Sequence, residues 1–313
     1  MTRLLIASTG GHLAELALLA PRFTPPDADE IWITFDSAQS RSLLAGHNIR
    51  YIRDTPPRDW RAMLTNIASA WGALDAGVDT AISNGAGIAV SFLPLAVVKG
   101  ISAHYIESAA RVDGLSVSGR ILEQARAIKA YTQFPERENQ RWQYRGSSLD
   151  GFRSEKVSAP RPMRSVFVTV GTLDFSFMGL LRRLREILPA TVQVTVQAGC
   201  DHERLDWPEA NVRAKMAYQE IQTNIANSDV VVAHAGIGSA LGVLQAGKVP
   251  VLVPRAASLG EHVDDHQTQI AAHLAERQLA VRAGSATIDL DDLSRALALR
   301  VVRTSAPPEF VLQ

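Results

Sequence analysis

The fold class is decided by the stretch at residues 231–239, which reads Val231-Val232-Ala233-His234-Ala235-Gly236-Ile237-Gly238-Ser239. An apolar run turns through small residues into a helical pattern, which is typical of a buried strand followed by a helix. A helix start carries about half a positive charge on its free N–H groups and suits an anion such as a diphosphate. His234 can donate a hydrogen bond to the same phosphates or to a uridine. A purely structural tight turn is the alternative, and we favour ligand binding.

The same strand-to-helix rhythm runs through the rest of the chain. Strands are predicted at 3–8, 30–35, 49–52, 79–83, 103–107, 128–132, 165–170, 193–197, 230–233 and 250–253. Helices are predicted at 12–19, 59–74, 88–99, 118–126, 176–187, 218–226, 238–245 and 265–276. This alternation predicts an α/β fold with parallel sheets, arranged as two Rossmann-like doubly wound domains.

The segment from Gly146 to Met163 separates the two halves, because it is rich in Ser, Gly, Pro and charge. We predict an N-terminal domain at 1–155 and a C-terminal domain at 156–313, whose last helix can pack back on the first domain. The two sheets are expected to face a central cleft, with ligands outside the carboxyl ends of the strands.

Composition excludes several classes of partner and site. The 313 residues include 32 Lys plus Arg and 32 Asp plus Glu, and this net charge of zero predicts no nucleic acid partner. The single cysteine, Cys200, fits a reducing cytoplasm and rules out a multi-cysteine metal site. The N-terminus lacks a signal-peptide pattern, and the longest apolar stretch, Ile88 to Val98, is shorter than the roughly 20 residues that span a bilayer. The sequence predicts a soluble or peripheral protein.

Glycines follow three further predicted strands. They stand in Ser8-Thr9-Gly10-Gly11-His12, in Ser83-Asn84-Gly85-Ala86-Gly87 and in Val170-Gly171-Thr172. None is a dinucleotide fingerprint or a phosphate loop with a Lys-Ser or Lys-Thr ending, which argues against dehydrogenases and NTPases. His12 is a candidate base at the mouth of the cleft, and the alternative is a surface histidine in the first turn of a helix.

The densest polar cluster follows the strand that ends at Val253-Pro254-Arg255. It reads Leu259-Gly260-Glu261-His262-Val263-Asp264-Asp265-His266-Gln267. Carboxylate, amide and imidazole groups can read sugar hydroxyls, because together they donate and accept hydrogen bonds. His262 and His266 with Glu261 or Asp265 also suggest a metal site, but a metal hydrolase needs a third ligand and an open position. We favour sugar recognition and predict no metal.

These motifs resemble a known family. The second half, with the His234–Ser239 turn, Pro254-Arg255 and Gly260–Gln267, resembles the donor-binding subunit of the dolichol-type UDP-N-acetylglucosaminyltransferase. The first half resembles the membrane-recruiting partner subunit. Its matching residues are Gly10-Gly11-His12-Leu13-Ala14-Glu15, Asn84-Gly85-Ala86-Gly87, Tyr105-Ile106-Glu107-Ser108, Arg111-Val112, Leu115-Ser116, Gly119 and Gln133-Phe134-Pro135-Glu136. The two subunits are fused here, as in bacterial exopolysaccharide glycosyltransferases with a glycosyltransferase family 28 C-terminal domain.

The resemblance implies a GT-B fold and an inverting hexosyltransferase that uses a UDP-sugar as substrate and needs no cofactor. It implies a polyprenyl diphosphate-linked sugar as acceptor, and a peripheral location on the inner face of the plasma membrane. By the same resemblance, 1–155 is the acceptor-binding and membrane-associating domain and 156–313 is the nucleotide-sugar donor-binding domain. The implied acceptor-binding residues are Gly10, Gly11, Asn84, Gly85 and Gly87, with His12 beside them. The implied donor-binding residues are Gly171, Thr172, His234, Gly236, Gly238, Ser239, Arg255, Glu261, His262, Asp265, His266 and Gln267.

One position departs from the resemblance. Relatives carry a glutamate that grips the ribose hydroxyls in the helix after the His-Ala-Gly turn, whereas this chain has Gly242. Gln245 and Glu261 are the candidates to replace it. This departure keeps two alternatives open, a soluble small-molecule glycosyltransferase and a non-catalytic scaffold that binds sugar nucleotides.

The expected chemistry is a single displacement in which a base removes the acceptor proton while UDP departs. His12 is the first candidate base, and Glu107, at the end of a buried strand, is the second; its alternative role is to cap the following loop. Asp27-Ala28-Asp29 and Asp289-Leu290-Asp291 follow no core strand and read as solvated carboxylates.

An apolar stripe with helical spacing lies near the middle of the first half. It consists of Trp60, Leu64, Ile67, Trp71 and Leu74, with Arg58 and Arg61 at its start. Core packing is the first interpretation of this stripe. Contact with a membrane surface is the alternative.

Overall fold

The structure is a computed structural model that describes residues 1–26, 28–54, 60–74, 77–158, 161–171, 175–256, 260–261 and 266–312, with the side chains of 60–65 left out. The chain forms two compact units. One unit contains Met1–Asp150 together with Ala306–Gln313, and the other contains Gly151–Ser305. The first division therefore falls between Asp150 and Gly151, inside the segment that separates the two halves of the sequence.

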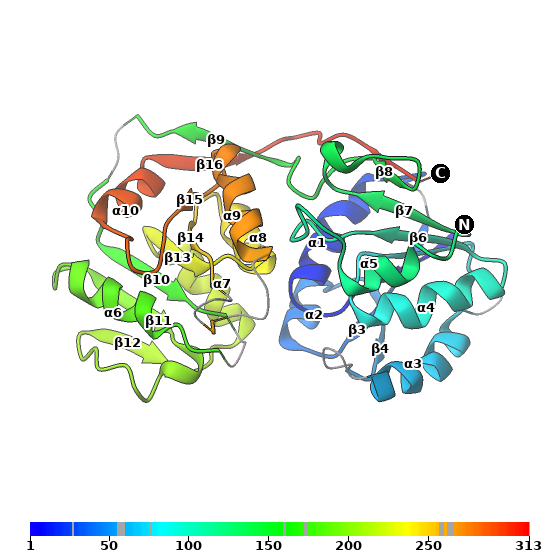
Figure 1. Cartoon of the computed structure of the whole chain (residues 1–313), viewed down its shortest axis with the longest axis horizontal. Coiled ribbons are helices and arrows are strands. Elements are labelled where there is room, and N and C mark those ends of the chain that lie inside the picture. The colour runs from blue at the N-terminus through cyan, green and yellow to red at the C-terminus, as the bar shows by residue number, and fades with distance from the viewer. Residues whose placement is uncertain are drawn as a thin grey trace. The chain divides into compact units, whose positions relative to one another are not determined.

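The first unit is built on a parallel sheet that has seven strands in the described part of the chain. In spatial order these are β4 (Asn48–Ile52), β3 (Asp29–Phe35), β1 (Thr2–Ile6), β5 (Thr80–Ser83), β6 (Ser102–Ile106), β7 (Ile128–Thr132) and β8 (Trp142–Tyr144). The chain runs outward from β1 to β4 and returns to β5 on the other side of β1. Figure 1 shows β6, β7 and β8 following one another in this unit. The switch point therefore lies between the carboxyl ends of β1 and β5, where open α/β sheets bind ligands.

Helices cover both faces of this sheet, because strand side chains alternate between the faces. Leu4 and Ile6 pack with α3 (Trp60–Ala73), α4 (Gly87–Val98) and α5 (Val117–Leu122). Leu5 and Ala7 pack on the other face with α1 (Gly11–Leu19) and with residues that follow α2 (Ala38–Leu43). This double coverage explains why the strands are apolar on both faces.

The second unit repeats this topology with a parallel sheet of six described strands. Their order is β12 (Ala210–Arg213), β11 (Gln193–Gln197), β10 (Ser165–Thr169), β13 (Val230–His234), β14 (Val251–Val253) and β15 (Val281–Arg282). The helices are α6 (Met178–Ile187), α7 (Tyr218–Asn227), α8 (Ile237–Gln245), α9 (His266–Glu276) and α10 (Leu290–Leu297). Here the switch point lies between the carboxyl ends of β10 and β13.

Two short pairings accompany the main sheets. In the second unit β9 (Phe152–Lys156) pairs antiparallel with β16 (Leu299–Arg303). In the first unit β17 (Phe310–Val311) pairs parallel with β2 (Phe23–Thr24). The last helix, α10, belongs to the second unit, and the segment that returns to the first unit is extended. Phe310 is fully buried there, against the rings of Phe23 and Tyr131.

Candidate active site

Two helices begin at the switch point of the first unit. Gly10 has a φ of +94°, and α1 starts at Gly11; α4 starts at Gly87 after Ala86. No described side chain caps either start. The third N–H group of each helix is already used, because Leu13 N donates to Ser8 O at 3.1 Å and Ala89 N donates to Ala86 O at 3.2 Å. The N–H groups of the first two residues of each helix are the ones available to an anion or to a hydroxyl of a bound molecule.

His12 connects the two strand ends. Its ring Nδ1 lies 2.9 Å from the carbonyl oxygen of Asn84, and Asn84 Nδ2 donates to the carbonyl oxygen of His12 at 2.8 Å. A carbonyl oxygen only accepts, so Nδ1 carries the proton and Nε2 is the basic nitrogen of the ring. Gly85 makes this contact possible, because a Cβ atom there would lie 2.8 Å from Cε1 of His12.

His12 is neutral at physiological pH. The ring is half-buried, and burial lowers its pKa from 6.5 to about 4. The hydrogen bond with Asn84 opposes this shift, and the positive charge of Arg111 adds to it. A neutral imidazole with a fixed tautomer and an unprotonated Nε2 has the form that a general base requires.

Glu107, the second predicted base, holds the loop that follows β6. Its Oε1 accepts hydrogen bonds from the Tyr105 hydroxyl and the Ser108 amide, both at 3.2 Å. Its Oε2 accepts from the Ser116 amide at 3.0 Å and the Ser116 hydroxyl at 3.2 Å. Burial raises the pKa of Glu107 and these hydrogen bonds oppose the rise. The contacts favour the loop-capping role that the sequence left as an alternative.

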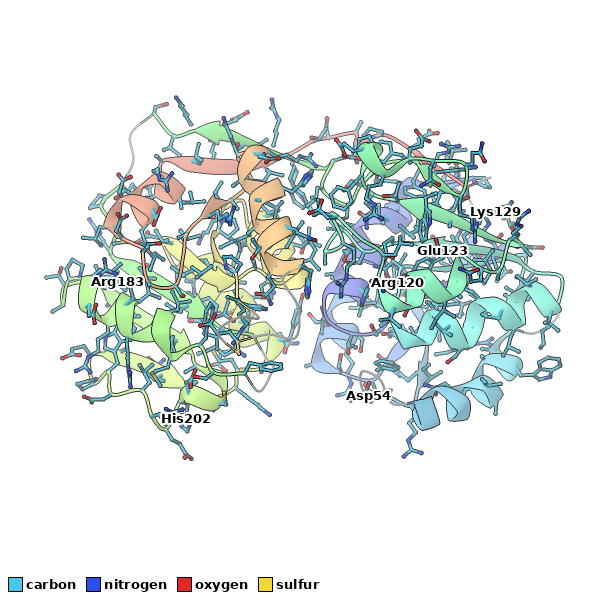
Figure 2. The ribbon with its side chains drawn as sticks, in the orientation of Figure 1. Asp54, Arg120, Glu123, Lys129, Arg183 and His202 are labelled. Atoms are coloured by element: carbon cyan, nitrogen blue, oxygen red, sulfur yellow. The ribbon has the colours of Figure 1, made fainter. Side chains whose placement is uncertain are left out.

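The capped loop leads into α5. Ser116, which Glu107 binds, is the N-cap of this helix and accepts a hydrogen bond from Gly119 N at 2.9 Å. Arg120 is exposed on this helix, and the half-buried Glu123 is its C-cap and accepts a hydrogen bond from Trp142 Nε1 at 3.2 Å (both are labelled in Figure 2). Glu107 thus fixes the start of α5 and the loop that carries Arg111.

Glu15 is a buried acid at the centre of a hydrogen-bond network, and the sequence gives no sign of this because its partners are distant in the chain. It lies one turn after His12 on α1 and is fully buried. It accepts hydrogen bonds from Ser108 Oγ at 2.6 Å, Ala109 N at 2.8 Å and Gln133 Nε2 at 2.7 Å. Burial raises its pKa to about 7, and these hydrogen bonds limit the rise. Glu15 therefore ties the helix of His12 to the ends of β6 and β7.

The switch point of the second unit has a similar construction around His234. Gly171 has a φ of +82°, and a Cβ atom there would lie 2.6 Å from Cε1 of His234. Gly236 also faces the imidazole, so closely that a Cβ atom would overlap Nε2. Gly171 and Gly236 both lie against the ring of His234. A side chain at either position would therefore displace the ring.

The start of α8 faces this switch point. Gly236 is its N-cap, and no described side chain caps the helix. Gly238 and Ser239 lie in the first turn and are half-buried. Free N–H groups, a nearby imidazole and a serine hydroxyl together form a site with the chemistry that a phosphate group needs.

Arg255 holds the loops around this site through hydrogen bonds to their backbone. It is fully buried and donates to the carbonyl oxygens of Val170 at 2.8 Å and Phe175 at 2.9 Å. Its guanidinium also stacks on Phe177, with 4.5 Å between Cζ and the ring centroid. These contacts give Arg255 a positioning role for the residues on either side of the 172–174 segment.

Two other members of the predicted donor cluster make comparable backbone contacts. Glu261 Oε2 accepts from Ala256 N at 3.0 Å, and Gln267 Oε1 accepts from Arg255 N at 3.0 Å. His266 is half-buried at the first position of α9. Thr172, His262 and Asp265 lie outside the described residues. His262 and Asp265 also belong to the alternative metal site suggested by the sequence, so that site is only partly described.

The described residues contain no group of three or more His, Cys, Asp or Glu side chains placed to hold a metal ion. None of the described helices is long and apolar enough to cross a bilayer.

The predicted apolar stripe on α3 does not form one buried face. Leu74 is buried, whereas Ile67 and Trp71 are exposed by 38% and 53%. Lys99 lies over the Trp71 ring, with Nζ 4.4 Å from its centroid. The core-packing interpretation is therefore wrong for Ile67 and Trp71, because the buried side of the helix carries Asn66 and Ala70 instead. The side chains of Trp60, Arg61 and Leu64, and the whole of Arg58, lie outside the described residues.

Known proteins resemble this chain in the sequence of one domain and in the fold of the whole chain. Residues 165–290 match the model of the glycosyltransferase family 28 C-terminal domain. Among curated protein sequences, none matches the chain.

Several solved structures share the fold over nearly the full length of the chain. Acinetobacter baumannii MurG is 19% identical with a TM-score of 0.58, over 94% of this chain and 89% of that one. The glycotransferase of kitacinnamycin is 16% identical with a TM-score of 0.54, over 95% and 89%. Arabidopsis thaliana UGT89C1, solved with UDP-L-rhamnose, is 15% identical with a TM-score of 0.56, over 95% and 89%. The second unit therefore matches the glycosyltransferase family 28 C-terminal domain over residues 165–290, and the whole chain shares the GT-B fold of these solved structures.

Proposed function

We propose that this protein is an inverting, metal-independent hexosyltransferase. It moves a sugar from a UDP-sugar to a polyprenyl diphosphate-linked sugar in bacterial polysaccharide biosynthesis. The family 28 domain and the GT-B fold support sugar transfer from a nucleotide donor. The acceptor class and the lipid rest on the motif resemblance of the first half.

The observation that carries the proposal is the state of His12. Its Nδ1 is committed to the carbonyl oxygen of Asn84, burial lowers its pKa and so leaves Nε2 unprotonated, and it lies at the switch point of a sheet. In the proposed reaction Nε2 takes the proton from the acceptor hydroxyl. The oxygen of that hydroxyl then bonds to the anomeric carbon of the donor sugar as the bond to UDP breaks. A single displacement of this kind inverts the anomeric centre.

In the proposed donor site, the diphosphate lies at the start of α8. The free N–H groups after Gly236 and the His234 imidazole stabilise the negative charge that develops on UDP as it departs. Ser239 and Gln267 are proposed as further donor contacts, with Arg255 and Glu261 holding the loops that carry them. Thr172, His262, Asp265 and His266 remain proposed donor contacts on the basis of the motif alone.

We propose that the first unit binds the inner face of the plasma membrane peripherally. Ile67 and Trp71 expose apolar surface on α3. Lys99 lies beside the Trp71 ring, and its Nζ donates to the carbonyl oxygens of Trp71 at 2.5 Å and Leu74 at 2.6 Å. Exposed apolar and aromatic side chains suit the boundary between headgroups and acyl chains, which supports peripheral membrane binding. The lipid-linked acceptor itself rests on the motif resemblance.

The proposal is tested by measuring UDP release from four donors, namely UDP-glucose, UDP-galactose, UDP-glucuronate and UDP-N-acetylglucosamine. Each donor is paired with a lipid diphosphate-linked sugar, with a panel of soluble phenolic acceptors, or with no acceptor. We expect release with one donor only when the lipid-linked acceptor is present. Release with soluble acceptors alone would support the small-molecule glycosyltransferase. Absence of release with every pair would support the non-catalytic scaffold.

A further inference from the structure

The motif Gln133-Phe134-Pro135-Glu136 follows β7 directly, and the proposed reaction does not use it. Its first residue, Gln133, is 2% exposed. A buried glutamine amide needs acceptors for its two N–H groups and donors for its oxygen, because burial of a polar group without a partner is unfavourable. The partners of Gln133 therefore indicate which parts of the first unit it holds together.

The NH2 group of Gln133 connects α1 to the end of β6. Its Nε2 donates to Glu15 Oε2 at 2.7 Å and to the carbonyl oxygen of Glu107 at 3.0 Å. These two bonds use both N–H groups of the amide. Glu15 lies three residues after His12 on α1, and residues three apart lie on the same face of a helix. Gln133 is therefore bonded to the helix that carries the proposed base.

The oxygen of Gln133 connects the same residues to the segment after β8. Its Oε1 accepts from Ser148 N at 2.8 Å and Ser148 Oγ at 2.9 Å, and from Ser147 Oγ at 3.4 Å. Both serines are buried. This segment ends at Asp150, the last residue before the chain passes to the second unit. One side chain thus joins α1, the end of β6 and the segment 147–150.

The direction of these hydrogen bonds requires an amide at position 133. Its oxygen faces donors, and its NH2 group faces acceptors. Methionine has a similar length, but it would leave the oxygens of Glu15 and Glu107 without this donor and the groups of Ser148 without their acceptor. Glutamate would place a second carboxyl group against Glu15. The hydrogen bonds at this position are therefore specific for glutamine.

We propose that Gln133 is a positioning residue for His12. By bonding Glu15 to two other parts of the unit, it fixes α1. The ring Nδ1 of His12 thereby stays within hydrogen-bond distance of the Asn84 carbonyl oxygen, 2.9 Å in the structure. Without this amide α1 can shift, and the tautomer that leaves Nε2 unprotonated is no longer fixed. The consequence for turnover rests on the proposed function of His12, whereas the effect on its ring does not.

The first test measures the steady-state kinetics of Gln133→Met by UDP release. We expect kcat to fall about tenfold to a hundredfold, because a small displacement of a catalytic group has a large effect on the rate. KM for the UDP-sugar should stay within about twofold of wild type, because the donor is proposed to bind the second unit. Gln140→Met is the matched control, since it replaces an exposed glutamine of the same unit and should match wild type.

The second test needs no turnover. Long-range 1H–15N spectra of protein with labelled histidines report which ring nitrogen carries the proton, and His12→Ala identifies the signal of His12. Wild type should show the proton on Nδ1. In Gln133→Met the ring should become a mixture of both tautomers, and the pKa of His12 should move from about 4 toward 6.5 as the ring becomes more exposed. Gln140→Met should keep the wild-type spectrum.

Gln133→Glu covers the case in which Gln133→Met fails to fold, because it keeps the size of the side chain. Glu15 and Glu107 are the acids bonded to this position, and Arg22 donates to the carbonyl oxygen of the neighbouring Ser147. Two adjacent carboxyl groups retain a shared proton to a higher pH than either alone, so at pH 5.5 the bond to Glu15 is kept. Loss of that proton by pH 8 should displace α1 through repulsion. We therefore expect kcat near wild type at pH 5.5 and at least about tenfold lower at pH 8.

A residue that only stabilises the fold would lower the free energy of unfolding and leave the His12 tautomer and the kcat of the folded protein unchanged. That result in Gln133→Met and Gln133→Glu would overturn the positioning role. A lower kcat with an unchanged tautomer would also overturn it, because Gln133 would then act other than through His12. If the tautomer changes as expected but wild type releases no UDP from any pair of substrates, the proposed function is wrong and the positioning of His12 stands.

Discussion

At the scale of single residues, the account depends on two histidines that pack against glycines at the two switch points. His12 and His234 follow predicted strands, and their positions can be read from the sequence. Their ring contacts cannot, because Gly85 and Gly171 are distant in sequence and approach only when the sheets form. The tautomer of His12 depends likewise on the carbonyl oxygen of Asn84, a tertiary contact with no local signal.

Replacing His12 by alanine should lower kcat about a hundredfold to ten-thousandfold, the usual contribution of a general base. UDP affinity should stay unchanged, because the donor is proposed to bind the second unit. His202→Ala, an exposed histidine labelled in Figure 2, is the control and should retain full activity. Steady-state kinetics and UDP titration check both. Normal turnover of His12→Ala would refute its role as base.

The pH profile of wild-type kcat/KM offers a second check on His12. Its pKa is lowered to about 4, so the base form is lost only as the pH falls through about 4. Activity that depends on this group should therefore be constant from pH 8 to pH 5.5 and should decline below that. An inflection near 6.5 that disappears in a His12 variant would contradict the shifted pKa.

The contacts of Gly85 with His12 and of Gly171 with His234 predict different effects, one on kcat and the other on UDP binding. Gly85→Ala places a Cβ atom against His12 and should lower kcat at least tenfold with UDP affinity retained, because the ring must move. Gly171→Ala places one against His234 and should weaken UDP binding by a similar factor. Gly100→Ala has a similar positive φ but nothing within 4 Å, so it controls for backbone strain alone. Equal effects of all three substitutions on UDP affinity would contradict this division.

At the scale of elements, apolar periodicity predicted the central strands and most helices closely. Ile128–Thr132 and Gln193–Gln197 coincide with β7 and β11, because buried parallel strands are apolar runs with sharp ends. β9 and β12 were not predicted: β9 reads Phe-Arg-Ser-Glu-Lys and β12 lies at a sheet edge. Their polar residues are compatible with solvent, so only pairing with another strand identifies them.

The hydrogen bonds of Glu15 hold α1 against the loop after β6, and the sequence shows only the motif in which it stands. Glu15→Gln should destabilise the first unit by about 1–3 kcal/mol. Both oxygens of Glu15 accept hydrogen bonds, and the NH2 group of glutamine would replace one of them and face a donor. The folded-state pKa of Glu15 is raised from 4.5 to about 7, so its contribution to stability is full below about 4.5 and is lost as the pH rises through 7.

Chemical denaturation of wild type and Glu15→Gln at pH 4.5, 6 and 8 measures this difference. The variant should lack the loss of stability that wild type shows between pH 4.5 and 7. Glu136→Gln, an exposed acid of the same unit, should keep the wild-type pH dependence. An unchanged pH dependence in Glu15→Gln would show that the carboxyl group is not perturbed in the folded state.

At the scale of the whole molecule, the chain leaves the first unit after Asp150 and rejoins it after Ser305. Arg22 binds both of these segments, through Asp150 Oδ2 at 3.1 Å and the carbonyl oxygen of Pro308 at 2.8 Å. The composition of the sequence predicts the division near Asp150. It does not predict the division after Ser305, because only the burial of Phe310 in the folded protein shows that the terminal segment belongs to the first unit.

Phe310→Ala should therefore destabilise the first unit by about 3–5 kcal/mol, the usual cost of removing a buried phenyl ring. The second unit should be unaffected, so UDP affinity at low temperature should match wild type. Val311→Ala, at an exposed neighbouring position, is the control. Thermal unfolding with and without UDP checks the result, and equal stability of the two variants would contradict the packing of this segment.

The central claim is sugar transfer between two bound substrates without a metal. The direct measurement is the mass of a lipid diphosphate-linked sugar acceptor after incubation with the protein, a UDP-sugar and excess EDTA. We predict that the acceptor gains the mass of one glycosyl residue of the donor, which is the sugar less one water, while an equimolar amount of UDP is released. Donor hydrolysis with an unmodified acceptor, or transfer that stops in EDTA and returns with a divalent cation, would contradict it.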